Sequence, residues 1–179
     1  ITKGAKHYDR GIRCPLIVAG GGTTRGNITD RLTASVDFFP TFCQWAGIAD
    51  EDLSPLEGKS FAPACEGEPH VQEHKELVVD MDGVTTLITN DGWRYSRYTH
   101  NGQSQLFHLA SDPDELNDLS QEKTYAGTLM SLQARLIDNM TATHSLPQYR
   151  SMPVENGRRL WVNNFETRPG PWNQSKPLA

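Results

Sequence analysis

The start of the sequence brings together residue types that could bind an anion: Lys3 and Gly4, followed by His7, Asp9 and Arg13. A glycine lets the backbone approach a ligand closely, and a neighbouring lysine supplies a compact positive charge. Such a pair could hold a negatively charged group of a substrate. The same residues could also form an ordinary solvated loop, so the cluster alone leaves both interpretations open.

The composition limits the class of protein. The chain has 179 residues, a net charge of −5, 36% hydrophobic residues and 22% charged residues, which is typical of a globular protein. The acidic balance gives no reason to expect a nucleic-acid or membrane partner, and no apolar run approaches the roughly 20 residues that span a bilayer. Cys14, Cys43 and Cys65 lack the spacing of a zinc site and are expected to be buried free thiols.

Two elements are predicted in the N-terminal third of the chain. The run Pro15–Gly20 is wholly apolar, which is typical of a strand buried on both faces of an α/β sheet. Apolar residues then recur every three or four positions, so we expect a helix that begins near Asp37, carries Pro40 in its first turn and ends before Gly47. Residues 49–75 show no sustained period and are expected to form a linker.

The following part of the chain alternates strand and turn signals. Four extended runs within residues 77–109 are separated by Asn90-Asp91-Gly92 and Asn101-Gly102, which are strong turn sequences. An antiparallel meander of four strands is therefore predicted. Apolar side chains along residues 122–141 predict a helix that covers one face of this sheet.

Two further predictions concern the segment that begins at Asp112 and the C-terminal residues 143–179. Asp112, Pro113 and Glu115 have the order of an N-cap, a first helical residue and a capping-box acid. Residues 143–179 are rich in Pro, Asn and Arg, and we expect them to form an extended arm.

Five segments of the sequence occur in the order found in one enzyme family. They read "KGAKHYDRGIRCPLIV", "DRLTASVDFFPTFCQWAGI", "EGKSFAP", "NDGWRYSRY" and "QLFHLASDPDELNDLS". Together they resemble the C-terminal part of the type I sulfatases of the alkaline-phosphatase superfamily. The resemblance implies an α/β fold that becomes α+β towards the C-terminus: the last strand and helix of a large α/β domain (1–48), the linker (49–75), a small subdomain with a helix-covered antiparallel sheet (76–142) and the arm (143–179).

The resemblance also assigns roles to residues. In that family the lysine of the Lys-Gly step binds the sulfate group, and here this residue is Lys3. An ammonium there would stabilise the charge that develops on the sulfuryl oxygens. His7 and His100 are candidates for substrate binding. Asp9, which replaces a more usual Glu, and Arg13 are expected to form a structural ion pair. His70, His74, His100 and Arg97 are residues that could touch an anionic sugar, and an ordinary surface position is the expected alternative for each of them.

The family uses a formylglycine nucleophile and calcium, and the sequence contains neither a C/S-x-P-x-R motif nor the paired Asp residues that hold the metal. We therefore expect no metal ligand in this chain, and we expect both cofactors upstream of Lys3, in a missing N-terminal catalytic portion. That portion would be the protein partner. The implied substrate is a sulfated small molecule or glycan, and the family favours a periplasmic or secreted location.

Two alternatives stay open at this level. The chain could belong to a phosphodiesterase or phosphonate hydrolase of the same superfamily, which the nucleophile motif would distinguish. It could instead be a non-catalytic binding module. A self-contained module should expose no apolar face around Pro15–Gly20, whereas a fragment of a larger protein should expose one.

Overall fold

The computed structural model describes residues 7–48, 56–68, 73–81, 83–144, 154–155 and 158–159. The chain divides into two compact units, residues 1–140 and residues 141–179. In the second unit, β5 (Val154–Glu155) pairs with β6 (Arg158–Arg159) as a short antiparallel ladder. The rest of the predicted arm lies outside the described residues, so its form stays a prediction.

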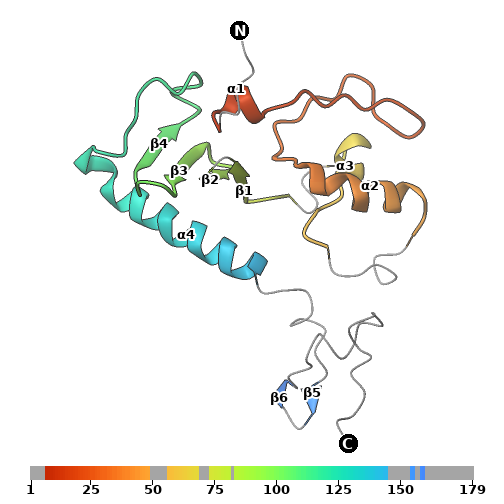
Figure 1. Ribbon diagram of the computed structural model, residues 1–179. Helices are drawn as coiled ribbons and strands as arrows, with labels where there is room; N and C mark the ends of the chain where they lie inside the picture. Colours follow the sequence, from red (N-terminus) through yellow and green to blue (C-terminus); the bar gives the residue numbers. More distant parts are fainter. Residues whose placement is uncertain are drawn as a thin grey trace, which may run out of the picture. The chain divides into compact units, whose positions relative to one another are not determined.

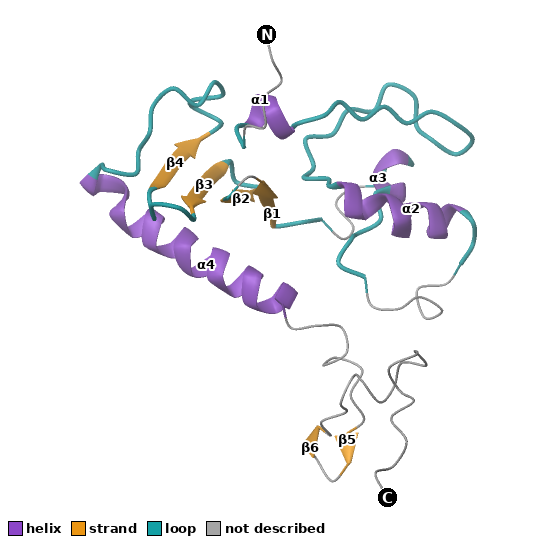
Figure 2. Ribbon diagram, in the orientation of Figure 1, coloured by secondary structure: helices purple, strands orange, loops and turns teal. Residues whose placement is uncertain are grey.

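A four-stranded antiparallel sheet forms the centre of the first unit, with the strands in sequence order (Figures 1 and 2). The turn at Asn90–Gly92 and the turn that contains Gly102 have glycine at positive φ, 89° and 68°, which explains why these turn sequences were informative. The predicted meander is confirmed. Its strands are β1 (Glu76–Met81), β2 (Val84–Thr89), β3 (Trp93–Tyr98) and β4 (Ser104–His108).

The helix α4 (Ala126–His144) covers one face of this sheet, as the sequence predicted (Figure 1). A short 3₁₀ turn, Lys123–Tyr125, leads into it. The fully buried side chains on this face come from three neighbouring strands and from α4, and they form the apolar core: Leu87, Tyr95, Leu106, Leu132 and Leu136.

The opposite face of the sheet is covered as well. All six residues of β2 are buried, which a sheet with one solvated face would not allow. The cover comes from the segment that contains α1 (Asp9–Ile12), because the ring of Tyr8 packs edge-on against Phe107 of β4. The N-terminal segment is therefore part of the sheet's second layer.

The predicted N-terminal helix is confirmed. It consists of a 3₁₀ turn, Ser35–Asp37, followed by α2 (Phe38–Trp45) with Pro40 in its first turn. Gly47 ends it at φ 74°, and the N–H of Ile48 donates to the carbonyl of Cys43. A further short helix, α3 (Ala62–Cys65), packs against α2.

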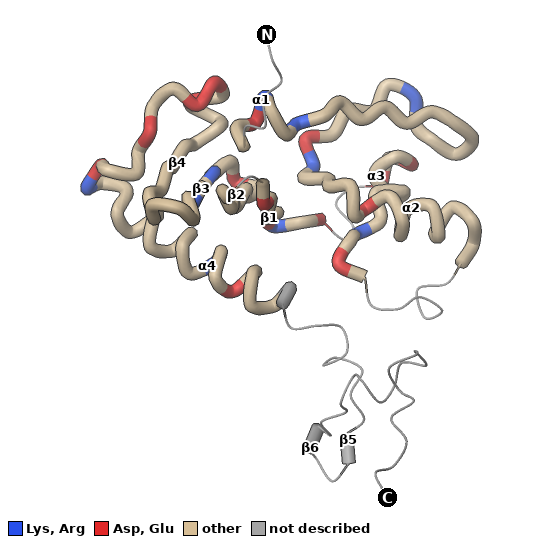
Figure 3. Tube along the Cα trace, in the orientation of Figure 1, with Lys and Arg blue, Asp and Glu red and all other residues tan. Residues whose placement is uncertain are grey.

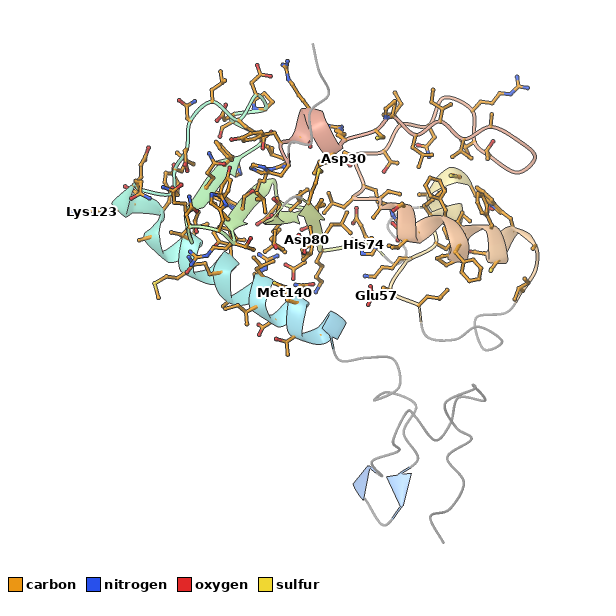
Figure 4. All side chains as sticks on the ribbon, viewed as in Figure 1. Asp30, Glu57, His74, Asp80, Lys123 and Met140 are labelled. Atoms are coloured by element: carbon orange, nitrogen blue, oxygen red, sulfur yellow. The ribbon has the colours of Figure 1, made fainter. Side chains whose placement is uncertain are left out.

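Asp37 holds this part of the chain together, although its side chain is completely buried. Its carboxylate accepts hydrogen bonds from the backbone N–H of Ala34 (2.8 Å), the backbone N–H of Lys59 (2.7 Å) and Nε2 of His74 (2.7 Å). Figure 4 labels His74, which precedes β1 in the chain. The expectation of a surface position for His74 is wrong, because this carboxylate requires a donor inside the protein. His70 lies outside the described residues, and Arg97 is exposed as expected.

The predicted strand at Pro15–Gly20 is not formed. The segment is irregular, and the side chain of Ile17 is 90% exposed. The physical reason is that a strand needs a hydrogen-bonded neighbour, and no strand in the described part of the chain pairs with this segment. Ile28, Phe39 and Phe42 are also exposed, so an apolar surface accompanies it. Cys43 is buried as predicted, whereas Cys14 is exposed, contrary to expectation.

The hydrogen bonds of Asp37 lead to a stability prediction. Asp37→Asn replaces one acceptor oxygen by a donor, so at least one buried partner loses its acceptor, at a cost of about 1–3 kcal/mol. We expect a lower Tm and a lower urea midpoint for this variant. Asp30→Asn, at an exposed position, is the matched control. Equal unfolding curves for the two variants would show that the buried carboxylate is dispensable.

Candidate functional site

Of the three predicted site residues, the structure describes two, His7 and His100. Lys3 lies outside the described residues. His7 is buried, and His100 is exposed beside the β3–β4 turn. Both histidine rings pack against the ring of Tyr98, with centroid distances of 5.3 Å for His7 and 5.9 Å for His100. Tyr98, which the sequence did not single out, therefore links the two predicted substrate-binding residues.

A cluster of hydrogen bonds converges on the side-chain oxygen of Gln105 in β4. The hydroxyls of Tyr98 and Tyr8 donate to it over 2.7 Å and 3.2 Å, and Nε2 of His7 lies 3.4 Å away. The hydroxyl of Tyr98 has one hydrogen, and Gln105 receives it. The contact of 3.1 Å between this hydroxyl and Nε2 of His7 therefore requires the imidazole to donate. Nε2 of His7 thus carries a hydrogen.

Burial favours the uncharged forms of two side chains of this cluster, His7 and Tyr98. Burial lowers the pKa of His7; the hydrogen bond to Gln105 opposes this shift and the positive charge of Arg94 adds to it. Burial also raises the pKa of Tyr98 to about 12, with contributions from the hydrogen bond to Tyr8 and from nearby negative charge. The cluster can orient polar groups through its hydrogen bonds.

A second network, made of charged side chains, holds Asp9, which follows Tyr8 in the chain. The guanidinium of Arg94 is completely buried, and its Nε lies 2.8 Å from Oε1 of Glu115, whose side chain is 3% exposed. Oδ1 of Asp9 lies 3.9 Å from Nη1 of Arg94, and the backbone N–H of Asp9 donates to Oε2 of Glu115 over 2.7 Å. In Figure 3 the acidic segment that precedes α4 lies next to α1. The predicted ion pair between Asp9 and Arg13 is confirmed at 3.6 Å.

This network is costly to form. None of the three guanidinium nitrogens of Arg94 makes a well-aligned hydrogen bond among the described residues, so its contact with Glu115 is an ion pair without full hydrogen bonding. Burial raises the pKa of Glu115 despite the attraction of Arg94. Glu115 also has a φ of 53°, the left-handed region that non-glycine residues avoid. These costs indicate that the network orients its segments rather than adding net stability.

The expected helix start at Asp112 is a turn instead. The carboxylate of Asp112 accepts from the N–H groups of Leu116 and Asn117, which lie further along the chain than the N2 and N3 residues that an N-cap bonds, and no helix follows. The reason is that Glu115 turns inward to Arg94 rather than back towards Asp112. A cap motif therefore serves here to hold a loop.

Together the two networks attach three consecutive residues, His7, Tyr8 and Asp9, to the sheet. One signal for this was present in the sequence: the alternation of "WRYSRY" puts Arg94 and Ser96 on one face of β3, and an arginine on a buried face requires a carboxylate partner. Which carboxylate it would be, and the role of Gln105, had no local signal.

Comparison with known proteins gives the family context. Residues 5–142 match the family described as N-sulphoglucosamine sulphohydrolase, C-terminal. The chain is 29% identical over 167 residues to a Δ4,5-hexuronate-2-O-sulfatase of Bacteroides thetaiotaomicron, covering 87% of this chain and 34% of that protein. It is 28% identical to a choline-sulfatase of Rhizobium meliloti, covering 96% of this chain and 34% of that protein. The chain thus spans about a third of these relatives' length.

Solved structures agree on the fold. A sulfatase structure from Bacteroides thetaiotaomicron is 28% identical with a TM-score of 0.52, covering 66% of this chain and 26% of that one. A complex of another protein with its substrate D-glucosamine-2-N,6-O-disulfate is 19% identical with a TM-score of 0.51, covering 64% and 25%. A phosphonate monoester hydrolase of Agrobacterium radiobacter is 18% identical with a TM-score of 0.58, covering 75% and 30%. The predicted α/β fold class is confirmed.

The lowered pKa of His7 predicts a pH dependence of folding. The unfolded chain binds a proton at the ordinary histidine pKa and the folded chain only at a lower pH, so folding stability falls as the pH drops below about 6.5 and levels off below the folded pKa. His7→Gln should remove this component. The measurement is urea unfolding of both proteins between pH 5 and pH 8. The same pH dependence in both would contradict a buried neutral His7.

The charged network predicts strong coupling between Arg94 and Glu115. Glu115→Gln leaves the buried guanidinium without its nearest counter-charge and should cost about 3–5 kcal/mol. Adding Arg94→Met to that variant should recover part of the loss, since no buried charge is then left unpaired. Asp114→Asn is the control, because the adjacent Asp114 pairs with Arg10 at the exposed surface. Additive effects of the two buried substitutions in chemical unfolding would argue against a coupled pair.

Proposed function

We propose that this chain is the C-terminal portion of an enzyme that hydrolyses sulfate esters. The chain belongs to the family described as N-sulphoglucosamine sulphohydrolase, C-terminal. The match across residues 5–142 carries this proposal, and sulfatases at 28–29% identity support it. The phosphonate hydrolase reading is less favoured, since the similarity to that enzyme at 18% identity extends to the fold alone.

The exposed apolar residues support a portion of a larger protein over a self-contained module. Ile17 is 90% exposed, Ile28 is 93% exposed and Phe39 and Phe42 are each 57% exposed. Side chains of this kind lose stabilisation when they face water, at about 25 cal/mol per Å² of apolar area. A catalytic portion packed on this surface would remove that cost, and the Pro15–Gly20 segment would then have a neighbour with which to pair.

The nucleophile and metal belong in that other portion. The sequence has no C/S-x-P-x-R motif, and no group of three or more His, Cys, Asp or Glu within the described residues could hold a metal ion. The sequence thus offers no formylglycine precursor motif and the described residues offer no metal cluster, so no step through formylglycine or calcium is assigned to them. In the described ranges no helix is long and apolar enough to cross a membrane.

The contribution of this chain would be to bind and orient the sulfate group. Lys3 would place its ammonium against the sulfuryl oxygens, where negative charge increases in the transition state. It precedes His7 by four residues. The attachment of His7, Tyr8 and Asp9 to the sheet gives this segment a fixed end, and a fixed charge stabilises a transition state better than a mobile one does. The substrate would be a sulfated saccharide or a sulfated small molecule.

Replacement of Lys3 tests this proposal in the protein that contains the complete catalytic portion. Lys3→Ala should lower kcat/KM for a sulfate ester about 100- to 1000-fold, the usual effect of removing one transition-state donor. Lys3→Arg should recover part of the activity, because a planar guanidinium does not replace a compact ammonium. Lys123→Ala, at an exposed position before α4, is the control. Near-native activity of Lys3→Ala would refute the role of Lys3.

A second prediction concerns the 179-residue chain by itself. It should not hydrolyse an aryl sulfate such as 4-nitrophenyl sulfate, because it supplies no formylglycine precursor motif. The assay is release of 4-nitrophenol by the purified chain, with heat-denatured chain as the background. Turnover above that background would contradict the proposal that the nucleophile lies elsewhere.

A further inference from the structure

The side of α4 that points away from the sheet carries large apolar side chains (Figure 1). The leucines of the core occupy the sheet-facing side, whereas Met130 is 70% exposed and Ile137 is 63% exposed. Gly127 and Ala134 are exposed on the same side. These four residues, called the outer stripe, follow one another at spacings of three and four. Such spacing is typical of the seam between two helices that pack against each other.

Gly127 leaves open space in the outer stripe. A Cβ at this position would meet no heavy atom within 4 Å, and its φ is not positive, so an alanine would fit here. Glycine is less favourable than alanine in a helix, because it loses more backbone entropy on folding. No contact within the described part of the chain explains the missing side chain. The space is therefore available to a side chain of another molecule.

The outer stripe is complementary to itself when two copies of α4 run antiparallel. If Ile137 of one helix lies opposite Gly127 of the second, Met130 lies opposite Ala134, and the same pairs recur across a two-fold axis. Each large side chain then faces a small one, which lets the helices approach closely. A parallel pair in register would instead place Met130 against Met130 and leave the space at Gly127 empty.

The charges beside the outer stripe favour the same arrangement. Among the exposed residues of 123–140, Lys123 and Asp138 are the charged ones. Figure 4 labels Lys123 at one end of α4, and Asp138 lies two residues before the labelled Met140 near the other end. In the antiparallel register Asp138 lies opposite residue 126 of the second copy. That is three residues, or about 4.5 Å along the axis, from the second copy's Lys123, within the reach of a lysine side chain.

We infer that the outer stripe is a dimer interface, in which the α4 helices of two copies of this chain pack antiparallel about a two-fold axis. Two ion pairs between Lys123 and Asp138 flank the apolar contact. α4 has 19 residues and is about 28 Å long, so an interface built on it is small. A reversible dimer with a Kd in the micromolar range is expected. Its formation does not depend on hydrolysis of a sulfate ester.

Sedimentation velocity of the protein with its complete catalytic portion tests the dimer, over about 1 to 100 µM. The mass should rise with concentration to twice that of one molecule. Ile137→Lys should raise Kd about 100-fold, because it buries an unpaired charge on each side of the interface. Gly127→Leu should raise it at least about tenfold, because the new side chain fills the space for Ile137. Leu116→Lys, which changes a side chain that is 78% exposed in the loop before α4, is the matched control.

A charge exchange tests the antiparallel register. Lys123→Glu should raise Kd about tenfold at low ionic strength, since two attractions become repulsions. Adding Asp138→Lys should restore the wild-type Kd, because the ion pairs are then reversed. Equal Tm values of all variants as monomers show that folding is unchanged.

Three results would overturn the inference. A wild-type protein that stays monomeric at every concentration would show that the catalytic portion or another partner covers the outer stripe. A dimer that is insensitive to Ile137→Lys and Gly127→Leu would form through a different surface. Failure of the double charge exchange to restore the Kd would exclude the antiparallel pairing of Lys123 with Asp138.

Discussion

The buried guanidinium of Arg94 is the constraint on which the arrangement of the first unit depends. A positive charge inside a protein is tolerated only near negative charge, and Arg94 obtains it from Glu115 and Asp9, which lie in two other segments of the chain. These segments must therefore meet at β3. Their meeting places α1 on the sheet and gives the sheet its second covering layer, opposite α4.

Two networks attach His7, Tyr8 and Asp9 to the sheet, and they differ in chemistry. The cluster around Gln105 consists of directional hydrogen bonds between polar side chains. The network around Arg94 is charged, imperfectly hydrogen-bonded and includes the strained backbone of Glu115. A protein retains such costs where position matters more than stability.

The apolar surface of the first unit consists of exposed hydrophobic side chains, in contrast to the buried polar networks. Around Pro15–Gly20 and along α2, large apolar side chains face water, and a segment with the composition of a strand has no partner. A chain that spans about a third of its relatives' length explains both observations if the remaining length packs here. The polar contacts join segments of this chain to one another, whereas the apolar side chains of this surface are exposed in the described part of the chain.

Local sequence by itself determined the elements whose signals are local. The turn glycines, the alternating strands and the helix periods of α2 and α4 depend on neighbours a few residues apart, and all were predicted. Tertiary structure decided the rest: the burial of His74 against Asp37, the irregular Pro15–Gly20 segment, and the convergence of His7 and Gln105, 98 residues apart. The physical reason is that hydrogen bonds and ion pairs between distant segments depend on how those segments pack, and residue type and spacing do not specify packing.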